Sequence, residues 1–340
     1  MTVEALRTPP TPLQLVDGDD RQLAGAARAI AALIVGIPFL ALVAGGLVAW
    51  RWGWGLSLRD VVLAAVLYFA TGHGMTVGFH RLLAHKAFTA RRPLKLVLVA
   101  LGSMAYEGGP VGWVANHRRH HVFSDTPKDP HSPHQAGPGL RGQLKGLWHA
   151  HVGWLFTYRG ASEQRHAADL LADRDIVVMN ALFPLWSVLS LALPFGLGWL
   201  LGGTLSAAFS ALLWAGLVRI FLLHHVTWSV NSLCHTFGRR PFPTKDRSRN
   251  VGALSIISMG ESWHNGHHAF PRSARHGVLG NQWDTSARII SVFERAGWVS
   301  DVHWPTPEAL DGFAADGARR RATATYRRTT PHDTGTERIA

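Results

Sequence analysis

Four long apolar stretches dominate the pattern of hydrophobic and polar positions along the chain. They cover residues 26–50, 60–80, 176–196 and 203–225. In a helix, about 20 residues rising about 1.5 Å each span a hydrocarbon core of roughly 30 Å. The pattern therefore predicts four transmembrane helices, with the last two joined as a tight hairpin.

The remaining stretches predict what surrounds these spans. The apolar stretch 94–106 is too short to cross a bilayer and ends at Glu107, so we expect an interfacial or re-entrant piece. Residues 1–25 are mostly polar and precede the first apolar stretch, which argues against a cleaved signal peptide. The basic tail 313–340 has no helical or strand period, which predicts disorder. Residues 26–312 are thus expected to form one all-α membrane domain.

Composition and charge agree with a membrane protein. Hydrophobic residues make up 47% of the chain and charged residues only 16%, which is too apolar for an ordinary soluble domain. The formal net charge of +12 fits anionic lipid better than nucleic acid, which we do not expect as a partner. Lys and Arg concentrate between residues 80 and 175 and after 226, so the positive-inside rule places both termini and both polar segments in the cytoplasm, at the cell membrane.

Histidine is the unusual residue, with 20 copies against a single cysteine, Cys234. Eight of them form three clusters: HRLLAH with His80 and His85, HRRHH with His117, His120 and His121, and HNGHH with His264, His267 and His268. In H-x-x-H-H on a helix, the first histidine lies over the other two, while the adjacent pair diverges by roughly 100°. One such turn can supply ligands to two metal ions. His80 and His85 are five apart, which predicts that the span ends between them and the chain bends.

The clusters predict a two-metal site at the cytoplasmic edge of the membrane. Neutral imidazole suits Fe, Zn, Cu or Ni, and eight imidazoles exceed what one ion accepts. The alternative, a purely structural role, is weak because closely packed imidazoles with few carboxylates nearby repel one another when protonated. We leave seven other histidines as non-ligands: His73, His131, His134, His149, His151, His224 and His225.

The order of these motifs between four spans resembles the integral-membrane fatty acid desaturases, specifically a bacterial type of the acyl-CoA delta-nine (stearoyl-CoA) branch. The resemblance covers about residues 57–285 and includes GFHRLLAHKAF, HRRHHVFSDTPKDPHS, HVGWLF, TWSVNSLCH and GESWHNGHHAFP. It implies a fold of four transmembrane helices whose cytoplasmic helical cap holds a di-iron site.

The resemblance also implies which residues hold the two iron ions. One iron would take His80, His85, His121 and His268, with Asn231 reaching it through a water; the other would take His117, His120, His235, His264 and His267. Trp113 and Thr227 would flank the kink of a narrow acyl tunnel, with Tyr68 near its closed end. On sequence alone, Trp113 could equally be an interfacial anchor.

Three carboxylates near the clusters are candidates to hold the ligands in place. Asp125, Asp129 and Glu261 could accept the remaining N–H of ligating imidazoles and so fix the ring tautomer. Ordinary helix-end or surface roles are the alternative, equally plausible for Asp125.

The activity implied is that of an acyl-CoA desaturase. It would use O₂ and electrons from a separate donor, ferredoxin-like or a flavin reductase, to form a cis double bond at the ninth position of a long saturated acyl chain. The alternatives are a fatty acyl or alkane hydroxylase on the same di-iron scaffold and, from another class, a membrane metal sensor or transporter. A transporter should place its ligands near the bilayer midplane rather than at the edge.

Two departures from the animal members of this branch bear on the substrate. Those members carry Arg-Asp, which helps hold coenzyme A, where this chain has Ala115 and Asn116. They have an amide beside the tunnel where this chain has Glu107. Four bases, Lys86, Arg91, Arg118 and Arg119, could still meet an anionic carrier such as coenzyme A, acyl carrier protein or a phospholipid headgroup, or could be a solvated face.

Overall fold

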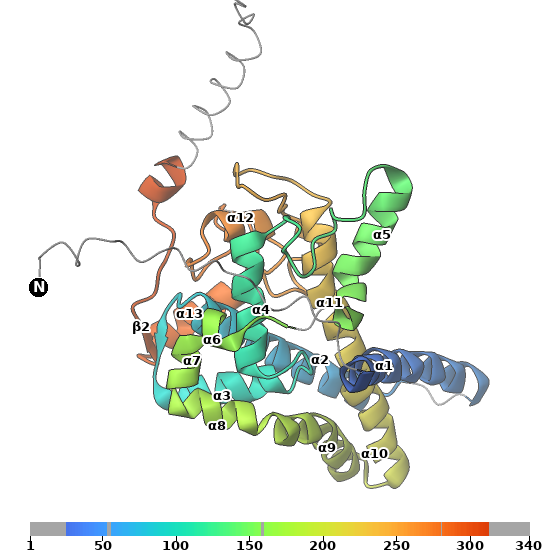
Figure 1. Ribbon diagram of the computed structural model, residues 1–340. Coiled ribbons are helices and arrows are strands. Elements are labelled where there is room, and N and C mark those ends of the chain that lie inside the picture. The colour runs from blue at the N-terminus through green and yellow to red at the C-terminus, as the bar shows by residue number, and fades with distance from the viewer. Residues whose placement is uncertain (1–24, 53–55, 158–159, 280, 313–340) are drawn as a thin grey trace, which may run out of the picture.

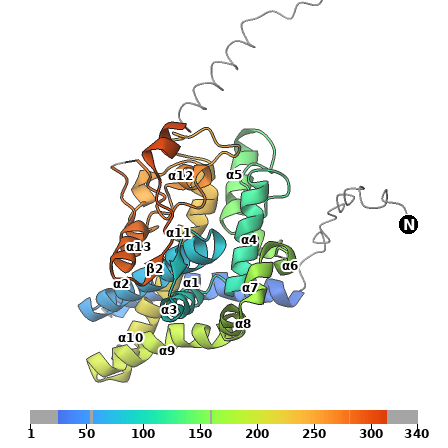
Figure 2. The same ribbon diagram turned by 90° about the vertical axis from the view of Figure 1, so that its left-hand side faces the viewer.

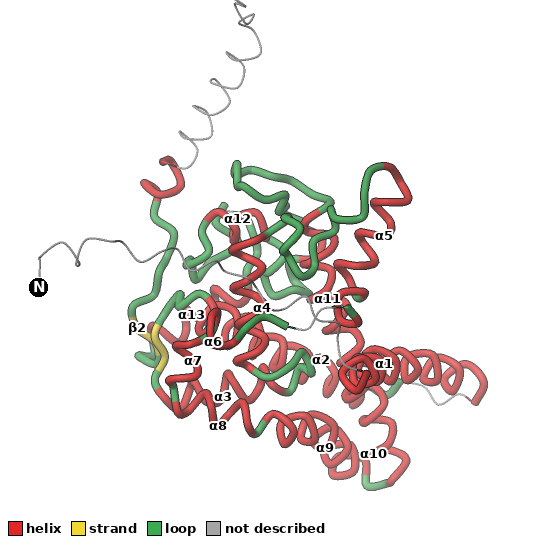
Figure 3. The backbone as a smooth tube through the Cα atoms, viewed as in Figure 1, coloured by secondary structure: helices red, strands yellow, loops and turns green. Residues whose placement is uncertain are grey.

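The computed structural model describes residues 25–52, 56–157, 160–279 and 281–312, and helices make up most of that part of the chain (Figures 1 and 3). The N-terminal segment and the basic tail predicted at residues 1–25 and 313–340 lie outside the described residues, except for Gly25. The α-helices are α1 (Gly25–Trp52), α2 (Leu58–His73), α3 (Arg92–Ser103), α4 (Pro110–Phe123), α5 (Gly139–His151), α6 (Glu163–His166), α7 (Ala168–Ala172), α8 (Arg174–Ala181), α9 (Phe183–Gly202), α10 (Leu205–Ala211), α11 (Arg219–Ser232), α12 (His264–Ala269) and α13 (Thr285–Arg295).

Two π-helices, three short 3₁₀-helices and one two-stranded antiparallel sheet complete these elements. They are η2 (Gly74–Ala84) and η4 (Leu212–Val218); η3 (Gly153–Phe156), η5 (Leu233–His235) and η6 (Gly252–Leu254); and β1 (Thr89–Ala90) with β2 (Val299–Ser300). In the sheet, Thr89 pairs with Ser300 and Ala90 with Val299, which ties the end of the described chain to the segment after η2.

Four helices are long and apolar enough to cross a membrane. They run over Gly25–Arg51, Leu58–Ala84, Phe183–Gly202 and Leu205–His235. The third spanning helix differs in its bounds from the predicted range 176–196. Residues 174–181 form the separate helix α8, and a new helix starts at Phe183, with Pro184 in its first turn. The fourth continues beyond the predicted 225 through α11 and η5, and this extension carries His235 to the histidine clusters.

The short apolar stretch forms the twelve-residue helix α3, which is not among the four spanning helices. It packs directly on η2, and glycines make the close approach possible. A Cβ at Gly74 would collide with the backbone of Leu101 and Gly102 on α3. The core of the domain lies here, around Val77, Phe79 and Val99, which are fully buried. This packing fixes η2, which carries His80 and ends one residue before His85.

Helices α4 and α12, which carry the second and third histidine clusters, lie at one end of the spanning helices. Figures 1 and 2 show the α9–α10 hairpin at the end of the molecule opposite α12, with α4 and α11 rising toward α12 and its flanking loops. The loops around α12 are long and irregular (Figure 3), so side-chain hydrogen bonds have to hold them.

Candidate metal centre

Two groups of histidine side chains meet inside the cap. The first contains His80, His85, His117, His121 and His267, and the second contains His120, His235, His264 and His268; within each group the candidate ligand atoms lie within 4.8 Å of one another. All nine histidines implied as ligands are therefore brought together. They come from η2, α4, η5 and α12 and from the residue that ends η2.

A π-helix brings His80 and His85 together. As predicted, the span ends between them, at Ala84, and the chain bends at His85. The backbone N–H of His85 donates to the carbonyl of His80 at 3.0 Å. This i to i+5 hydrogen bond is the π-helical pattern, which is rare and frequent at functional sites. Its wider turn places residues five apart on one side, and the two ring centroids are 4.8 Å apart.

The two groups divide the nine histidines differently from the sets that the resemblance implies. His268 belongs to the second group, while His117 and His267 belong to the first. The cause is the helical period, because residues four apart are offset by only about 40° and residues three apart by about 60°. The i, i+4 pairs His117–His121 and His264–His268 therefore stay together, and the adjacent pairs are split between the groups.

The spacing of the nitrogen atoms fits transition-metal ions. In the second group, the Nε2 atom of His264 lies 3.0 Å from that of His235 and 3.0 Å from that of His268. In the first, the Nε2 atom of His267 lies 2.9 Å from that of His121. Two nitrogens bound to one ion at about 2.1 Å, at right angles, are about 3 Å apart. These sets can thus hold one metal ion each.

Carboxylates set the tautomer of four of these rings. The Nδ1 atoms of His80, His120 and His235 lie 2.5, 3.0 and 2.9 Å from oxygens of Glu261, Asp129 and Asp125, respectively. A fourth carboxylate, Asp246, lies 2.7 Å from the Nδ1 atom of His268. Each Nδ1–H donates to its carboxylate, which leaves Nε2 with a free lone pair facing the group.

Asp246 was missed by the sequence analysis because it belongs to no motif. It lies among bases in the segment between the fourth span and the third cluster, 22 positions before His268. Asp246 is the only acid among several bases, and this is the feature of the sequence that could have marked it as a candidate.

Behind Glu261 lies a buried network that the sequence analysis also missed. The guanidinium of Arg81 donates to Glu261 at 3.2 Å and to Asp284 at 3.0 Å, and Asp284 caps α13. His276 is fully buried, and its Nδ1 lies 3.4 Å from a Glu261 oxygen. Burial opposes ionisation of Glu261, but attraction to His80, His276 and Arg81 outweighs it and holds the pKa of Glu261 well below its usual range.

Burial also keeps four of the clustered imidazoles neutral. Removal from water, reinforced by repulsion between neighbouring imidazoles, holds the pKa of His117, His121, His264 and His267 well below the usual value. Neutral imidazoles are the form that binds a metal, so at neutral pH these side chains are ready to bind without first losing a proton.

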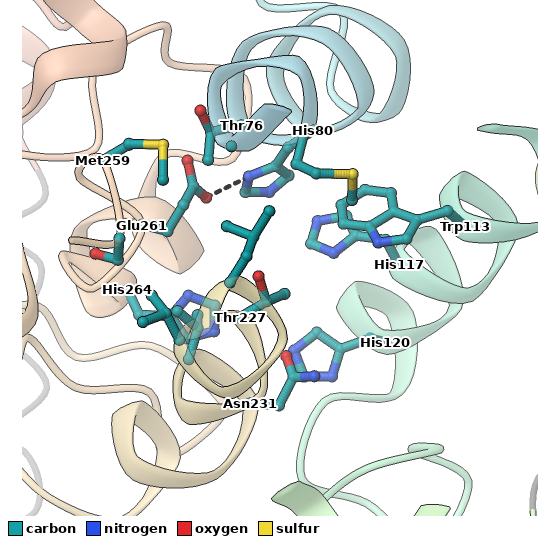
Figure 4. A pocket seen from close by; sticks show the side chains of 16 residues that line it. Thr76, His80, Trp113, His117, His120, Thr227, Asn231, Met259, Glu261 and His264 are labelled. Carbon is teal, nitrogen blue, oxygen red and sulfur yellow. Dashed lines mark ion pairs between the residues drawn. The ribbon is translucent and has the colours of Figure 1, made fainter. Parts of the chain in front are cut away.

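The other predicted site residues lie close to the two groups. Asn231 is one helical turn before His235 and lines the same cavity as His120 and His264 (Figure 4). The seven histidines left as non-ligands lie outside both groups. His224, for example, bonds the carbonyl of Ala105, and His225 bonds His151.

A narrow cavity of about 60 Å³ runs beside the histidines of both groups. Gly72, Thr76 and His80, on successive turns of α2 and η2, line one side of it, so it extends along this helix away from the metal centre. Tyr68, one turn beyond Gly72, does not line the cavity; its hydroxyl donates to the carbonyl of Ile257 at 2.7 Å, two residues before Met259, which does line it. Tyr68 is thus held in place just beyond the residues that line the cavity.

A second cavity of about 250 Å³ adjoins the first, and Trp113, His117, Thr227 and Asn231 line both. The ring of Trp113 stacks on that of His117 at 5.1 Å, so Trp113 is a cavity residue rather than an interfacial anchor. Figure 4 shows Trp113, His117, Thr227 and Asn231 around one opening. The two cavities therefore adjoin at Trp113 and Thr227, the two residues that the resemblance places at the kink of an acyl tunnel.

Glu107 lies beside this junction. The Nε1 atom of Trp113 donates to its carboxylate at 3.3 Å, and the side chain of Thr227 also bonds it. The other carboxylate oxygen, Oε1, is buried without a hydrogen bond. Burial, only partly offset by Thr227 and Trp113, raises the pKa of Glu107 to about 7.

Replacing Glu107 by glutamine is expected to stabilise the protein at alkaline pH. Because the folded-state pKa is raised, the contribution of Glu107 is fully favourable below its unfolded value near 4.5 and is lost as pH rises through about 7. The loss is worth about 3 kcal/mol. Thermal unfolding of Glu107→Gln should therefore lack this fall between about pH 4.5 and pH 7, while the exposed control Glu308→Gln should retain it. Equal pH profiles for Glu107→Gln and the unmodified protein would contradict the prediction.

The positions expected to meet an acyl carrier are mostly occupied within the protein. Lys86 and Arg118 both pair with Asp169, at 2.7 and 2.6 Å. Ala115 is fully buried, and the Asn116 side chain accepts from the backbone N–H of Ala161 at 2.7 Å. Asn116 nevertheless lines the wider cavity, so this position lies at the path that an acyl chain would take.

Comparison with known proteins agrees with this site. The chain is 40% identical over 266 residues to the hex-5-enoyl-[acyl-carrier protein] acetylenase of Moorena producens, covering 78% of this chain and 83% of that protein. It is 37% identical to the delta-9 acyl-lipid desaturase 1 of Arabidopsis thaliana, over 72% of this chain and 75% of that protein. It is 35% identical to the sn-1 stearoyl-lipid 9-desaturase of Anabaena variabilis, over 75% of this chain and 81% of that protein. Residues 60–278 match the fatty acid desaturase family model. The chain belongs to the fatty acid desaturase family.

Proposed function

We propose that this protein introduces a cis double bond at the ninth position of a long saturated acyl chain, carried as acyl-CoA. The two adjoining cavities beside both histidine groups carry the proposal, because together they could hold a methylene chain against both groups. Relatives that act at the ninth position support the position, and relatives that act on acyl-CoA, such as the acyl-CoA C20 Delta5-desaturase of Anemone leveillei, support the carrier.

Two iron ions would be held by the nine histidines, with Asn231 placed to bind through a water beside His120 and His264. When bound, iron supplies the oxidising power, drawn from O₂ and two electrons, that removal of hydrogen from an unactivated methylene requires. The protein's own part is positional. Glu261, Asp129, Asp125 and Asp246 hold the ligand rings, and the enclosed path excludes water from the acyl chain.

The turn of the path would determine which bond reacts. Trp113 is held by its hydrogen bond to Glu107 and by stacking on His117, so the wall at the turn is rigid. A rigid turn fixes how far a chain enters before its reacting carbons reach the metal centre, and Tyr68, held just beyond Gly72, limits the length beyond them. The protein would span the cell membrane, with both termini and the metal centre on the cytoplasmic side, where its basic segments lie.

Expression in a host that lacks unsaturated fatty acids tests the function. Mass spectrometry of the extracted lipids should locate a new double bond at the ninth position, absent when His120→Ala is expressed instead. A hydroxylated chain would show a hydroxylase, and another bond position would overturn the regiochemistry. Purified protein should be given stearoyl-CoA, stearoyl-acyl carrier protein or stearoyl-phospholipid, and we expect it to act fastest on stearoyl-CoA. A preference for either of the other two carriers would overturn the proposal that the substrate is an acyl-CoA.

A further inference from the structure

A second opening reaches the metal centre from another side. It is a cleft of about 610 Å³, and its wall includes His85, His121 and His268. The two acyl cavities are lined instead by His80, His117, His120 and His264, and no residue lines both the cleft and either cavity. Ligands of both histidine groups therefore face the cleft, through ring edges that the acyl chain does not contact.

The rim of this cleft is positively charged. Residues 243–246 line the cleft, and they belong to the segment 239–249, which we call the basic loop. The loop contains five bases, Arg239, Arg240, Lys245, Arg247 and Arg249, and a single acid, Asp246. The carboxylate of Asp246 is buried and bonded to His268 and Ser248, so it does not offset the charge outside. Lys245 and Arg272 both line the cleft and are exposed, and neither forms an ion pair with a carboxylate of the described residues.

The basic loop is fixed to the ligand helix rather than free. The side chain of Asn265, between two ligands on α12, accepts from the backbone N–H of Phe242 at 2.8 Å and donates to its carbonyl at 3.0 Å. Asp246 fixes the same loop to His268 at 2.7 Å. A partner seated on the loop would thus be held at a set position, separated from the metal centre by one imidazole ring.

The reaction proposed above needs such a partner. Its balance is –CH₂–CH₂– + O₂ + 2 e⁻ + 2 H⁺ → –CH=CH– + 2 H₂O, so two electrons must come from a reductant besides the acyl chain. Within the described residues, the single cysteine, Cys234, is buried and hydrogen-bonded to the carbonyl of Ser262, and no cysteine set exists for an iron–sulfur cluster. The electrons therefore enter from outside, most directly where ligand edges are accessible.

We propose that the cleft and the basic loop form the docking site of a small acidic one-electron carrier protein, which delivers electrons through the ring edges of His85, His121 and His268. This rests on the proposed function. Charge complementarity selects the partner, since a positive rim steers and orients an acidic protein. An acyl carrier protein is also acidic, but it has to dock where the acyl path opens, and the cleft shares no lining residue with that path.

Charge reversal tests the docking site. The variant Lys245→Glu/Arg272→Glu is compared with Arg141→Glu/Lys145→Glu, which makes the same change in net charge at exposed positions of α5. Both are placed in nanodiscs, and binding of a plant-type [2Fe–2S] ferredoxin is measured at low salt and at about 0.5 M salt. We expect the cleft variant to weaken binding at least about tenfold, the control to change it less than twofold, and high salt to remove the difference.

A second measurement separates this proposal from the proposed function. Ferredoxin-driven turnover should fall at least about tenfold in the cleft variant, while turnover with a small photoreduced flavin stays within twofold of the unmodified protein. No turnover of the unmodified protein with either reductant would overturn the function, and the binding measurement would still decide the docking site. Equal ferredoxin binding by both variants, or a loss confined to acyl carrier protein or to vesicles of anionic phospholipid, would overturn the docking site.

Discussion

Replacing His267 by alanine is expected to abolish desaturation and to remove one of the two metal ions, while the protein still inserts into the membrane. His267 is fully buried, and its Nε2 atom lies 3.1 Å from that of His80 and 2.9 Å from that of His121. Losing a residue that only orients a ligand costs about 10- to 100-fold in metal affinity or activity, so losing the ligand itself should cost more than about 100-fold.

The same result is expected for His120→Ala in the second group, and His149→Ala serves as the control. His149 lies on α5 and bonds only the carbonyl of Pro130 among the described residues, so its loss should leave turnover within about twofold. Metal analysis should show about two ions per chain in the control and about one in either ligand variant. Full activity in either ligand variant would refute the ligand assignment.

The parts of this site that could be read from the sequence are those set by local periodicity. His117, His120 and His121 lie within one turn of a helix, and their relation follows from the helical repeat alone. The four apolar stretches likewise determine four spanning helices without any knowledge of how they pack. Resemblance supplied His235, which no spacing rule connects to the three clusters.

The parts that could not be read depend on contacts across the chain. Asp246 contacts His268 because Asn265 fixes the basic loop on α12. The residues next to Asp246 in the sequence do not predict this contact. The π-helix that brings His80 next to His85 packs directly on α3, and the spacing of the histidines along the chain does not predict its wider turn. The start of the third spanning helix at Phe183 was misplaced for a simpler reason, because the apolar residues 176–179 of α8 are separated from those of α9 by a single polar residue, Asn180.

The narrow arm of the acyl path should be the most sensitive part of the substrate site. Gly72 is buried on α2 and lines the narrow cavity beside Leu223 and Met259. A Cβ at this position would collide with the end of the Met259 side chain and lie 3.4 Å from a methyl carbon of Leu223. Any larger side chain must therefore enter the space that the end of an acyl chain would occupy.

Gly72→Leu is accordingly expected to lower turnover of a stearoyl chain by about 100-fold, because filling a packed cavity costs about 1–3 kcal/mol. A lauroyl chain, which is six carbons shorter, should lose much less, and both metal ions should remain bound. Val66→Leu, a lipid-exposed position on the same helix, is the matched control and should convert both chains normally. Equal losses for both chains would mean that Gly72 supports the fold of α2 rather than the length of the path. Unchanged turnover of the stearoyl chain would show that the acyl chain takes a different route past the metal centre.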